Sequence, residues 1–327
     1  MKKRIALITV VIMVVTLMTA FTKNLSKQPE DIQSNPSSTK IDENENTPVS
    51  ILLVGYGWFS GIPDGQINNA EMVANALDGE KITSVDGSIS AVIHSITVPV
   101  QWNKALQPVL EAIEKYNPQI VLGMGTAGGI SGLRIEPYGV NWMKGTDSDP
   151  QNPDMQIEKN EKIIADGPDY VKGTLPYKDI VIALLENQIP ATLGKLTSID
   201  TSAPSTSTTT TSVAPSTSKT TSKVAPAGNV TPITIPYRSS TGMYLCNYMA
   251  YMLPYTLSQQ TDVMTGFIHL PTQLGYVTQG RLNMLKDLSE EELTKRLTFS
   301  LPATMSLDEM VKGIKISLIT SLETLNP

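Results

Sequence analysis

Short, wholly apolar segments that alternate with amphipathic helical segments are the feature that most restricts how this chain can fold. From Val49 onward, apolar or β-branched runs have the length of buried strands, at 50–55, 91–100, 120–123 and 266–270. Segments with helical spacing lie between or after them, at 69–77, 102–116, 177–187, 248–257 and 307–322. This alternation predicts an α/β fold, a three-layer αβα sandwich with a mainly parallel central sheet. Ligands of such sheets bind at the carboxyl ends of the strands.

The last of these helices has a well-marked start. Ser306 and Glu309 have the spacing of a capping box. The apolar residues that follow fall on one helical face: Leu307, Val311, Ile314, Leu318 and Leu322. We therefore expect a helix that begins directly after Ser306.

Two tracts of low complexity bound the part of the chain that can fold. Residues 24–48 are rich in Ser, Asn, Asp, Glu, Lys and Pro and predict a disordered tether. A Ser/Thr/Pro-rich stretch lies within a second tract, at about 194–237, which we expect to be an insertion on the surface. One catalytic domain, 49–327, is then interrupted by this insertion.

The N-terminus has the pattern of an export signal. Lys2, Lys3 and Arg4 precede the uncharged apolar run Ile5–Phe21. Residues 1–23 are therefore predicted to be a signal peptide or a signal anchor, with the membrane as a partner and the basic end in the cytoplasm. The domain would lie outside the cell, anchored to the membrane, or be secreted if the signal is cleaved.

The composition excludes several classes of function. The net charge of -6 offers no basic surface to nucleic acid. Two histidines and one cysteine supply no set of zinc ligands, so we expect no metal and no cofactor, although these counts leave a carboxylate-only metal site open. The sequence is compatible with a homo-oligomer.

A glycine-rich segment follows the apolar run at 120–123. Gly123, Gly125 and Gly128 match the spacing of a dinucleotide fingerprint, but the continuation Gly129–Pro137 is a poor helix. We interpret the segment as a turn that brings backbone N–H groups to a small ligand. A phosphate site like that of nucleoside phosphorylases is an alternative, for which Arg134 is the one basic candidate near the turn.

The single cysteine, Cys246, lies in a turn-rich lead into an apolar helix, where the helix dipole favours a thiolate. His269 lies at the end of an apolar strand, where α/β enzymes place catalytic groups. Glu136, one of many acidic residues, follows the glycine-rich segment and can orient an imidazole through Nδ1, which leaves Nε2 to take the thiol proton. A buried structural cysteine and a packed histidine are the alternative interpretation.

Several motifs in order make the chain resemble the pyroglutamyl peptidase (pyrrolidone carboxyl peptidase) family of cysteine peptidases, from about Ile51 to the C-terminus. These motifs are Gly125-Thr-Ala-Gly-Gly129, Gly167-Pro-Asp-Tyr170, Ser240-Thr-Gly-Met-Tyr-Leu-Cys246-Asn247 and Gly266-Phe-Ile-His269-Leu-Pro271. The resemblance implies a Cys246–His269–Glu136 triad that releases an N-terminal pyroglutamyl residue from peptides with blocked N-termini.

The resemblance also implies a substrate pocket. Phe59 and Tyr244 match positions that hold the lactam ring, Tyr56 lies nearby in the sequence, and Thr126 stands where the family has Gln. The segments 56–68 and 142–154 depart from the family pattern. These departures leave pyroglutamyl specificity open, with a catalytically impaired surface binding protein of the same fold as the alternative.

Overall fold

The computed structural model describes residues 48–60, 62, 66–148, 156–199, 235–272, 289 and 305–325. The predicted signal at 1–23, the tether except for its last residue, and 200–234 of the insertion lie outside these ranges. Residues 46–327 belong to one compact unit. No helix within the described ranges is both long and apolar enough to cross a bilayer, and the run Ile5–Phe21 is not among them.

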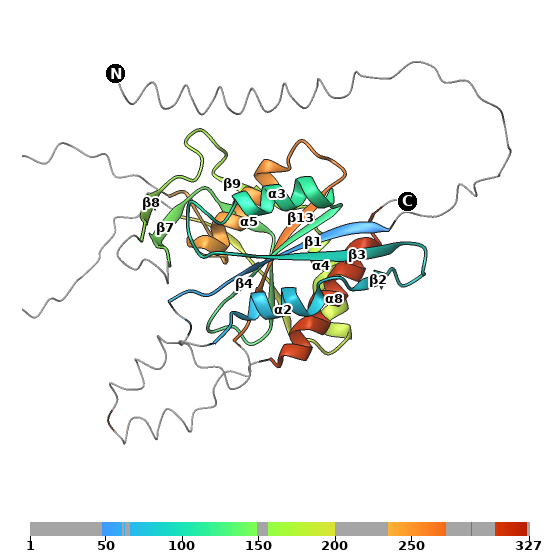
Figure 1. The fold of residues 1–327 in the computed structure, drawn as a ribbon. Coiled ribbons are helices and arrows are strands. Elements are labelled where there is room, and N and C mark those ends of the chain that lie inside the picture. Colours follow the sequence, from blue (N-terminus) through green and yellow to red (C-terminus); the bar gives the residue numbers. More distant parts are fainter. Residues whose placement is uncertain are drawn as a thin grey trace, which may run out of the picture. The chain divides into compact units, whose positions relative to one another are not determined.

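A seven-stranded sheet lies at the centre of the described unit (Figure 1). Its strands, in spatial order, are β10 (Ala191–Leu193), β5 (Leu133–Glu136), β13 (Met264–Leu270), β4 (Ile120–Thr126), β1 (Val49–Tyr56), β3 (Ser90–Val98) and β2 (Lys81–Thr83). The four strands β13, β4, β1 and β3 are parallel, whereas β5 and β2 run antiparallel to their neighbours β13 and β3. The prediction of a mainly parallel sheet is therefore confirmed.

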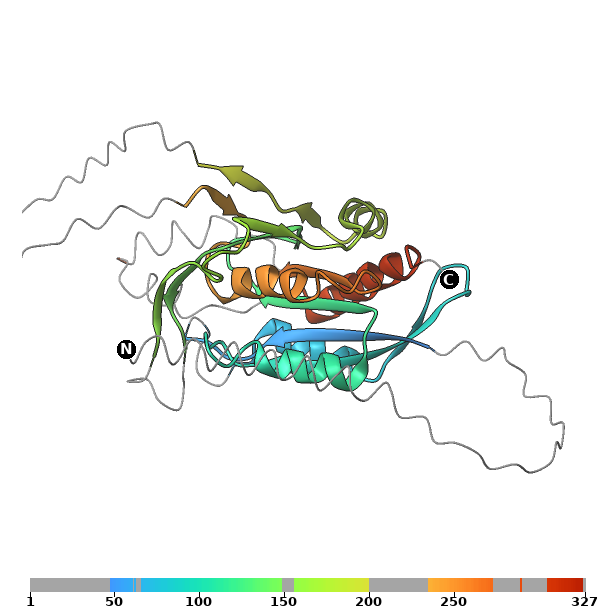
Figure 2. The same cartoon turned by 90° about the horizontal axis from the view of Figure 1, so that it is seen from above.

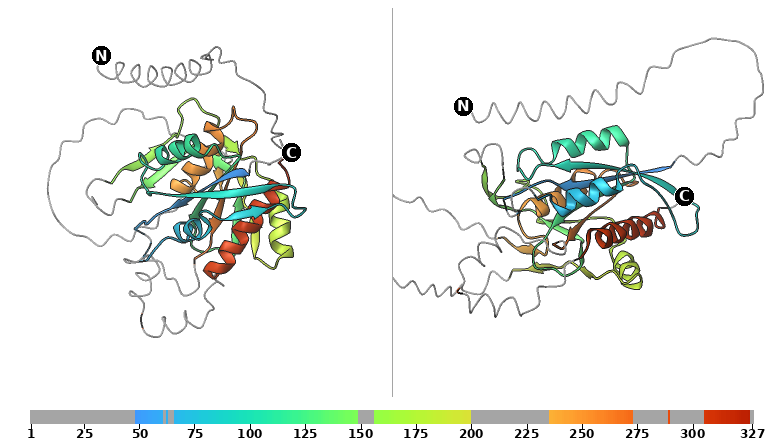
Figure 3. Two further views of the ribbon diagram at one scale, coloured as in Figure 1. Left: turned by 45° about the vertical axis from the view of Figure 1, so that its right-hand side comes forward. Right: turned by 60° about the horizontal axis from the view of Figure 1, so that its bottom comes forward.

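Helices cover both faces of this sheet, which gives the three expected layers (Figure 1). The described helices are α2 (Asn69–Leu77), α3 (Gln107–Tyr116), α4 (Tyr177–Glu186), α5 (Leu245–Thr256) and α8 (Leu307–Leu322). One core packs α2, α4 and α8 against the sheet, and the other packs α3 and α5 against its opposite face. Figure 3 shows α8 beside α4 in both of its views.

The strand β1 shows why the central strands are apolar throughout. Ile51 and Leu53 belong to the core beneath α2, α4 and α8, whereas Leu52 and Val54 belong to the core beneath α3 and α5. Successive side chains of a strand point to opposite faces, so a strand covered on both sides needs an apolar residue at every position.

Three two-stranded ribbons lie outside this sheet. They are β6 (Tyr138–Val140) with β9 (Tyr170–Lys172), β7 (Met143–Thr146) with β8 (Glu158–Glu161), and β11 (Leu196–Ser198) with β12 (Tyr237–Ser239). Figure 2 shows the β7–β8 ribbon beyond the end of β1. The two ends of the expected insertion thus form a paired ribbon, which sequence patterns did not predict.

Two helix starts differ from expectation. The helix predicted over 102–116 begins only at Gln107, because Pro108 favours the first turn and Trp102 instead donates its backbone N–H to Asp147 Oδ2 at 3.1 Å. The helix predicted from Tyr248 begins earlier, at Leu245, so that Cys246 is already helical.

The predicted capping box of α8 is confirmed. The Ser306 Oγ accepts from the Glu309 backbone N–H at 3.2 Å, and the Glu309 carboxylate accepts from the Ser306 backbone N–H at 2.8 Å. We expect Ser306→Ala to lower the free energy of unfolding by about 1 kcal/mol, because the helix loses its N-cap. Urea denaturation measures the change, and Ser306→Thr, which keeps a capping hydroxyl, serves as the control. Equal stability of the Ala and Thr variants would contradict the role given to this cap.

Candidate active site

The candidate nucleophile Cys246 is the second residue of α5, over the sheet strand β4. The start of α5 comes so close to β4 that a Cβ on Gly125 would lie 2.7 Å from the Cys246 Sγ. At this helix position the backbone N–H has no partner within the helix and the dipole is positive, so both can act on an anion. The side chain of Cys246 is partly buried.

This close approach corrects the interpretation of the glycine-rich segment. Gly123 and Gly125 lie within β4, which continues to Thr126, and only the residues after it form a turn. A Cβ on Gly123 would lie 2.7 Å from the Phe267 ring, so these glycines serve packing. The segment leads into β5 and not into a helix, which removes the main requirement of a dinucleotide fingerprint.

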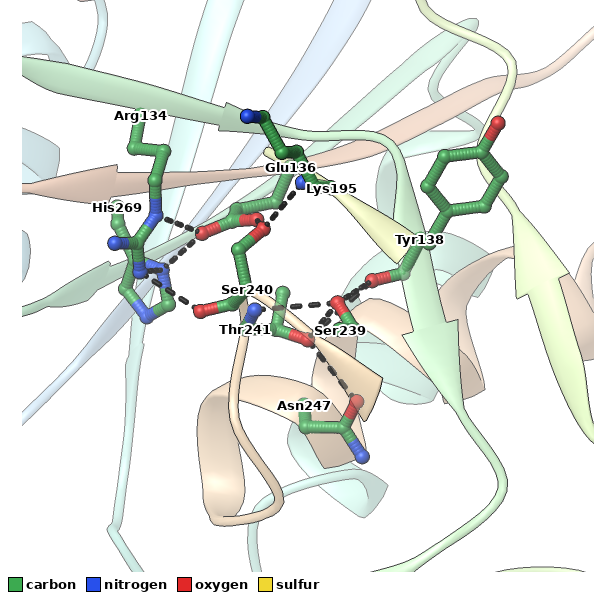
Figure 4. Close-up of polar contacts among 9 residues, drawn as sticks. All are labelled: Arg134, Glu136, Tyr138, Lys195, Ser239, Ser240, Thr241, Asn247 and His269. Atoms are coloured by element: carbon green, nitrogen blue, oxygen red, sulfur yellow. Dashed lines mark hydrogen bonds and ion pairs between the residues drawn. The ribbon is translucent and has the colours of Figure 1, made fainter. Parts of the chain in front are cut away.

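The order of the sheet strands places His269 beside Glu136. His269 pairs with Gly125 of β4 on one side and with Arg134 of antiparallel β5 on the other, and Glu136 pairs with Phe267. Cross-strand partners share a face of the sheet, so the side chains of Arg134, Glu136 and His269 meet on one face (Figure 4). The Glu136 Oε1 lies 2.8 Å from the His269 Nδ1.

The carboxylate of Glu136 is buried, with 2% of the residue exposed, and it has three partners. Besides His269, Arg134 donates from Nε to Oε1 at 2.5 Å, and the Ser240 hydroxyl donates to Oε2 (Figure 4). Burial raises the pKa of Glu136, but the hydrogen bond and charge of His269, followed by the bonds from Ser240 and Arg134, lower it below its ordinary value. Glu136 is therefore an anion that can orient and stabilise an imidazolium.

His269 is equally buried, with 3% of the residue exposed. Burial alone lowers its pKa, but the charge and hydrogen bond of Cys246, followed by the hydrogen bond and charge of Glu136, raise the pKa to about 9. Because Glu136 occupies Nδ1, Nε2 is the ring nitrogen left for the sulfur. The structure thus brings the three predicted residues of the triad into one chain of contacts.

A pocket opens beside the sulfur. It is lined by Tyr56, Phe59, Asn68, Val100, Gly125, Thr126, Tyr244, Leu245 and Cys246, which include all four predicted substrate-binding residues. Its volume of about 60 Å³ has room for about four to six water molecules, and hence for one small ring. None of these described lining residues is an Asp, Glu, Lys or Arg, so the pocket suits an uncharged group.

Hydrogen bonds to protein groups fix the polar groups of the pocket. The Tyr56 hydroxyl donates to the Leu245 carbonyl oxygen at 2.6 Å, and burial, followed by the charge of Cys246, raises the tyrosine pKa well above its ordinary value. Thr126 Oγ1 donates to Asn68 Oδ1 at 2.6 Å, and the Tyr244 hydroxyl donates to the Thr146 carbonyl oxygen at 2.9 Å. The pocket is therefore rigidly built before any ligand enters.

Sequence reasoning missed several residues that hold the site together. Asn247 is fully buried; its side-chain oxygen accepts from the Val140 N–H, and its amide donates to the carbonyls of Val140 and Trp142, each at 2.9 Å. It thereby fixes the start of α5 against the chain that follows Glu136. Ser240 and Asn68 were also missed as site residues, since only the fold brings them to Glu136 and Thr126.

The described residues contain no group of three or more His, Cys, Asp or Glu side chains that could hold a metal ion. Arg134, the one candidate for a phosphate-binding cation, is instead engaged with Glu136 and Ser240.

The contacts of His269 lead to a prediction for its titration. Replacing Cys246 with Ala should lower the pKa of His269 well below about 9, because the two largest contributions that raise it are removed. NMR titration of histidine-labelled protein measures this directly, since the chain has only two histidines. The other, His94, stacks on Tyr116 and is the internal reference. An unchanged midpoint for His269 would show that the sulfur does not interact with the imidazole.

Known proteins resemble this chain along most of its length. The model of the pyroglutamyl peptidase family matches residues 49–203 and 197–324. The pyrrolidone-carboxylate peptidase of Pyrococcus furiosus is 25% identical over 278 residues, 85% of this chain and 100% of that protein. Its counterpart from Lactobacillus acidophilus is 24% identical over 277 residues, 84% of this chain and 100% of that protein.

The fold gives the same result. A structure of pyrrolidone carboxyl peptidase from the hyperthermophile Pyrococcus furiosus is similar, with a TM-score of 0.55 and 25% identity over 85% of this chain and 100% of that one. The family match spans well over half of the sequence and both segments that carry the site. The chain therefore belongs to the pyroglutamyl peptidase family and is a hydrolase of the cysteine peptidase class.

Proposed function

We propose that this chain is an exopeptidase that releases an N-terminal pyroglutamyl residue from peptides, with Cys246 as nucleophile, His269 as acid and base, and Glu136 as the residue that orients His269. The observation that carries the proposal is the uncharged pocket beside the Cys246 sulfur, which lies in contact with the buried His269–Glu136 pair. Membership of the family supports the same substrate.

The chemistry of the pocket supports a blocked N-terminus as the substrate. A free N-terminus carries an ammonium group, and its burial without an acidic partner costs several kcal/mol. No acidic side chain is among the described residues that line the pocket. A pyroglutamyl ring is neutral and flat, so the aromatic faces of Phe59 and Tyr244 suit it, and Thr126 can hydrogen-bond to its lactam group.

The first half of the proposed reaction forms an acyl-enzyme. The Cys246 thiolate attacks the pyroglutamyl carbonyl carbon, and the oxyanion that forms accepts a hydrogen bond from the backbone N–H of Cys246. As the C–N bond breaks, His269 gives its Nε2 proton to the leaving amine. The products are a thioester and the shortened peptide.

The second half releases the acid. The imidazole, now neutral at Nε2, takes a proton from water, which attacks the thioester carbonyl. The C–S bond then breaks, the thiolate is restored, and His269 is an imidazolium again. Glu136 keeps Nδ1–H in place through both halves because it accepts from that nitrogen at 2.8 Å.

The segment 142–154, which departs from the family pattern, contacts the pocket residue Tyr244 and its neighbour Met243, although none of its described residues lines the pocket. Lys144 of β7 donates its backbone N–H to the Met243 carbonyl, and Tyr244 reaches back to Thr146. Asp147 is buried and accepts from the backbone N–H groups of Trp102 and Ile157 at 3.1 and 2.7 Å. These contacts keep Tyr244 at the pocket, which supports a ring-binding site despite the altered sequence.

Hydrolysis of a fluorogenic pyroglutamyl amide by residues 49–327 tests the proposal. We expect turnover that Cys246→Ala abolishes and that a thiol alkylator removes. Prolyl and glutaminyl amides, which carry a charged N-terminal nitrogen, should be cleaved at least about 100-fold more slowly, because the pocket lacks an acidic partner. A folded protein with an alkylatable thiol but no turnover on any of these substrates would instead favour the surface binding protein.

We further propose that the domain works outside the cytoplasm, on the basis of the basic residues 2–4 and the apolar run Ile5–Phe21. In a bacterial host, full-length protein with a C-terminal tag should expose the tag to protease added to intact cells. A variant without residues 1–23 is the matched control and should be protected inside. Membrane-bound tag indicates an anchor, and released tag indicates a cleaved signal. A full-length protein as protected as the control would refute export.

A further inference from the structure

Arg134 lies in the middle of the candidate active site without a role in the triad. It stands two residues before Glu136 on β5, and residues at that spacing share one face of a strand. Its side chain is 23% exposed. Its Nε donates to Glu136 Oε1 at 2.5 Å, and its Nη2 donates to the Ser240 carbonyl oxygen at 2.8 Å (Figure 4). The guanidinium is thus held from two sides.

The same carboxylate oxygen serves two donors. Glu136 Oε1 accepts from Arg134 Nε and also lies 2.8 Å from His269 Nδ1. Arg134 Nη2 lies 3.3 Å from that Nδ1. A guanidinium nitrogen has only N–H groups to offer, so it cannot accept from a protonated Nδ1. The contact therefore places a fixed positive charge against the imidazole.

Among the described residues, the charges that face His269 come from two elements. From α5 comes the Cys246 sulfur, and from β5 come Glu136 and Arg134. On its own strand, the Phe267 ring packs edge-on against the imidazole, with 5.2 Å between the centroids. A thiolate and a carboxylate both stabilise an imidazolium, and Arg134 is the cation among these groups that opposes it.

We propose that Arg134 is a positioning residue that sets the basicity of His269, because it shares the Glu136 oxygen and offsets the charge of the carboxylate. The inference rests on the proposed function, in which His269 must both release and take up a proton. An imidazole facing two uncompensated anions would hold its proton too tightly to release it readily to the leaving amine near neutral pH. The positive charge of Arg134 lowers the pKa of His269 and so brings it closer to neutral pH.

The decisive experiment is a titration of His269 in protein that carries Cys246→Ala, where no thiol titrates beside it. Adding Arg134→Met should raise the NMR midpoint of His269 by at least about half a pH unit, because a cation is lost beside it. Adding Arg134→Lys, which keeps the charge, should shift it less. Arg238→Met is the matched control, since Arg238 is exposed on β12, and it should leave the midpoint unchanged.

Kinetics with Cys246 intact supply the second readout. Arg134→Met should lower kcat about tenfold, because a more basic His269 releases its proton less readily to the leaving amine. It should leave KM within about twofold, because Arg134 does not line the pocket. The alkaline limb of the pH profile should move to higher pH. If the Met variant does not fold, Arg134→Gln removes the charge and keeps an amide donor for Glu136.

A midpoint for His269 that stays unchanged or falls in the folded neutral variants would overturn the proposal. The titration uses inactive protein, so it reports on Arg134 even if no pyroglutamyl substrate is cleaved. Conversely, turnover of the unaltered enzyme with an unmoved His269 midpoint would leave the proposed function intact and remove this role of Arg134 alone.

Discussion

The late strand β13 enters the sheet between β4 and β5, and the site depends on this one placement. Pairing of β13 with β4 sets His269 opposite Gly125, above which α5 carries Cys246. Antiparallel pairing with β5 sets His269 opposite Arg134 and next to Glu136. Three separate chain segments thus bring their side chains to one site: Cys246 from α5, His269 from β13, and Arg134 with Glu136 from β5. A register shift of a single residue would turn His269 to the other face of the sheet.

Close packing of backbone against side chain makes this arrangement rigid. Gly123 and Gly125 leave room on β4 for the Phe267 ring and the Cys246 sulfur, which a side chain would fill. Gly194 does the same for Glu136, because a Cβ there would lie in contact with the carboxylate and the Ser240 hydroxyl. The absence of Cβ atoms at these three positions lets the catalytic groups approach one another while remaining shielded from water. A buried charge network keeps its strength only under such shielding.

Much of this architecture could be predicted from the sequence. Apolar runs such as 50–55 and the capping box at Ser306 identified strands and a helix, because both are local signals. The motifs around Cys246 and His269 led to the residues that the fold brings together. Long-range pairing could not be predicted: nothing in the sequence around Glu136 indicates that β5 runs antiparallel to β13. For this reason Arg134 was considered only as a phosphate ligand and not as a neighbour of His269, although its spacing of two from Glu136 on a strand already places both side chains on one face.

The β11–β12 ribbon at the ends of the insertion determines how freely the length of the inserted segment can vary. Ile199 donates its backbone N–H to the Pro236 carbonyl oxygen at 2.8 Å, so these two positions, which flank the segment 200–235, are held side by side. The entropy cost of closing a loop between two such fixed points grows only with the logarithm of its length. Segments of very different length and composition can therefore be accepted here with little effect on stability. The β11–β12 ribbon is therefore a position at which foreign sequence can be inserted into the domain. It is also connected to the active site, because Ser240, which follows β12, donates a hydrogen bond to the carboxylate of Glu136.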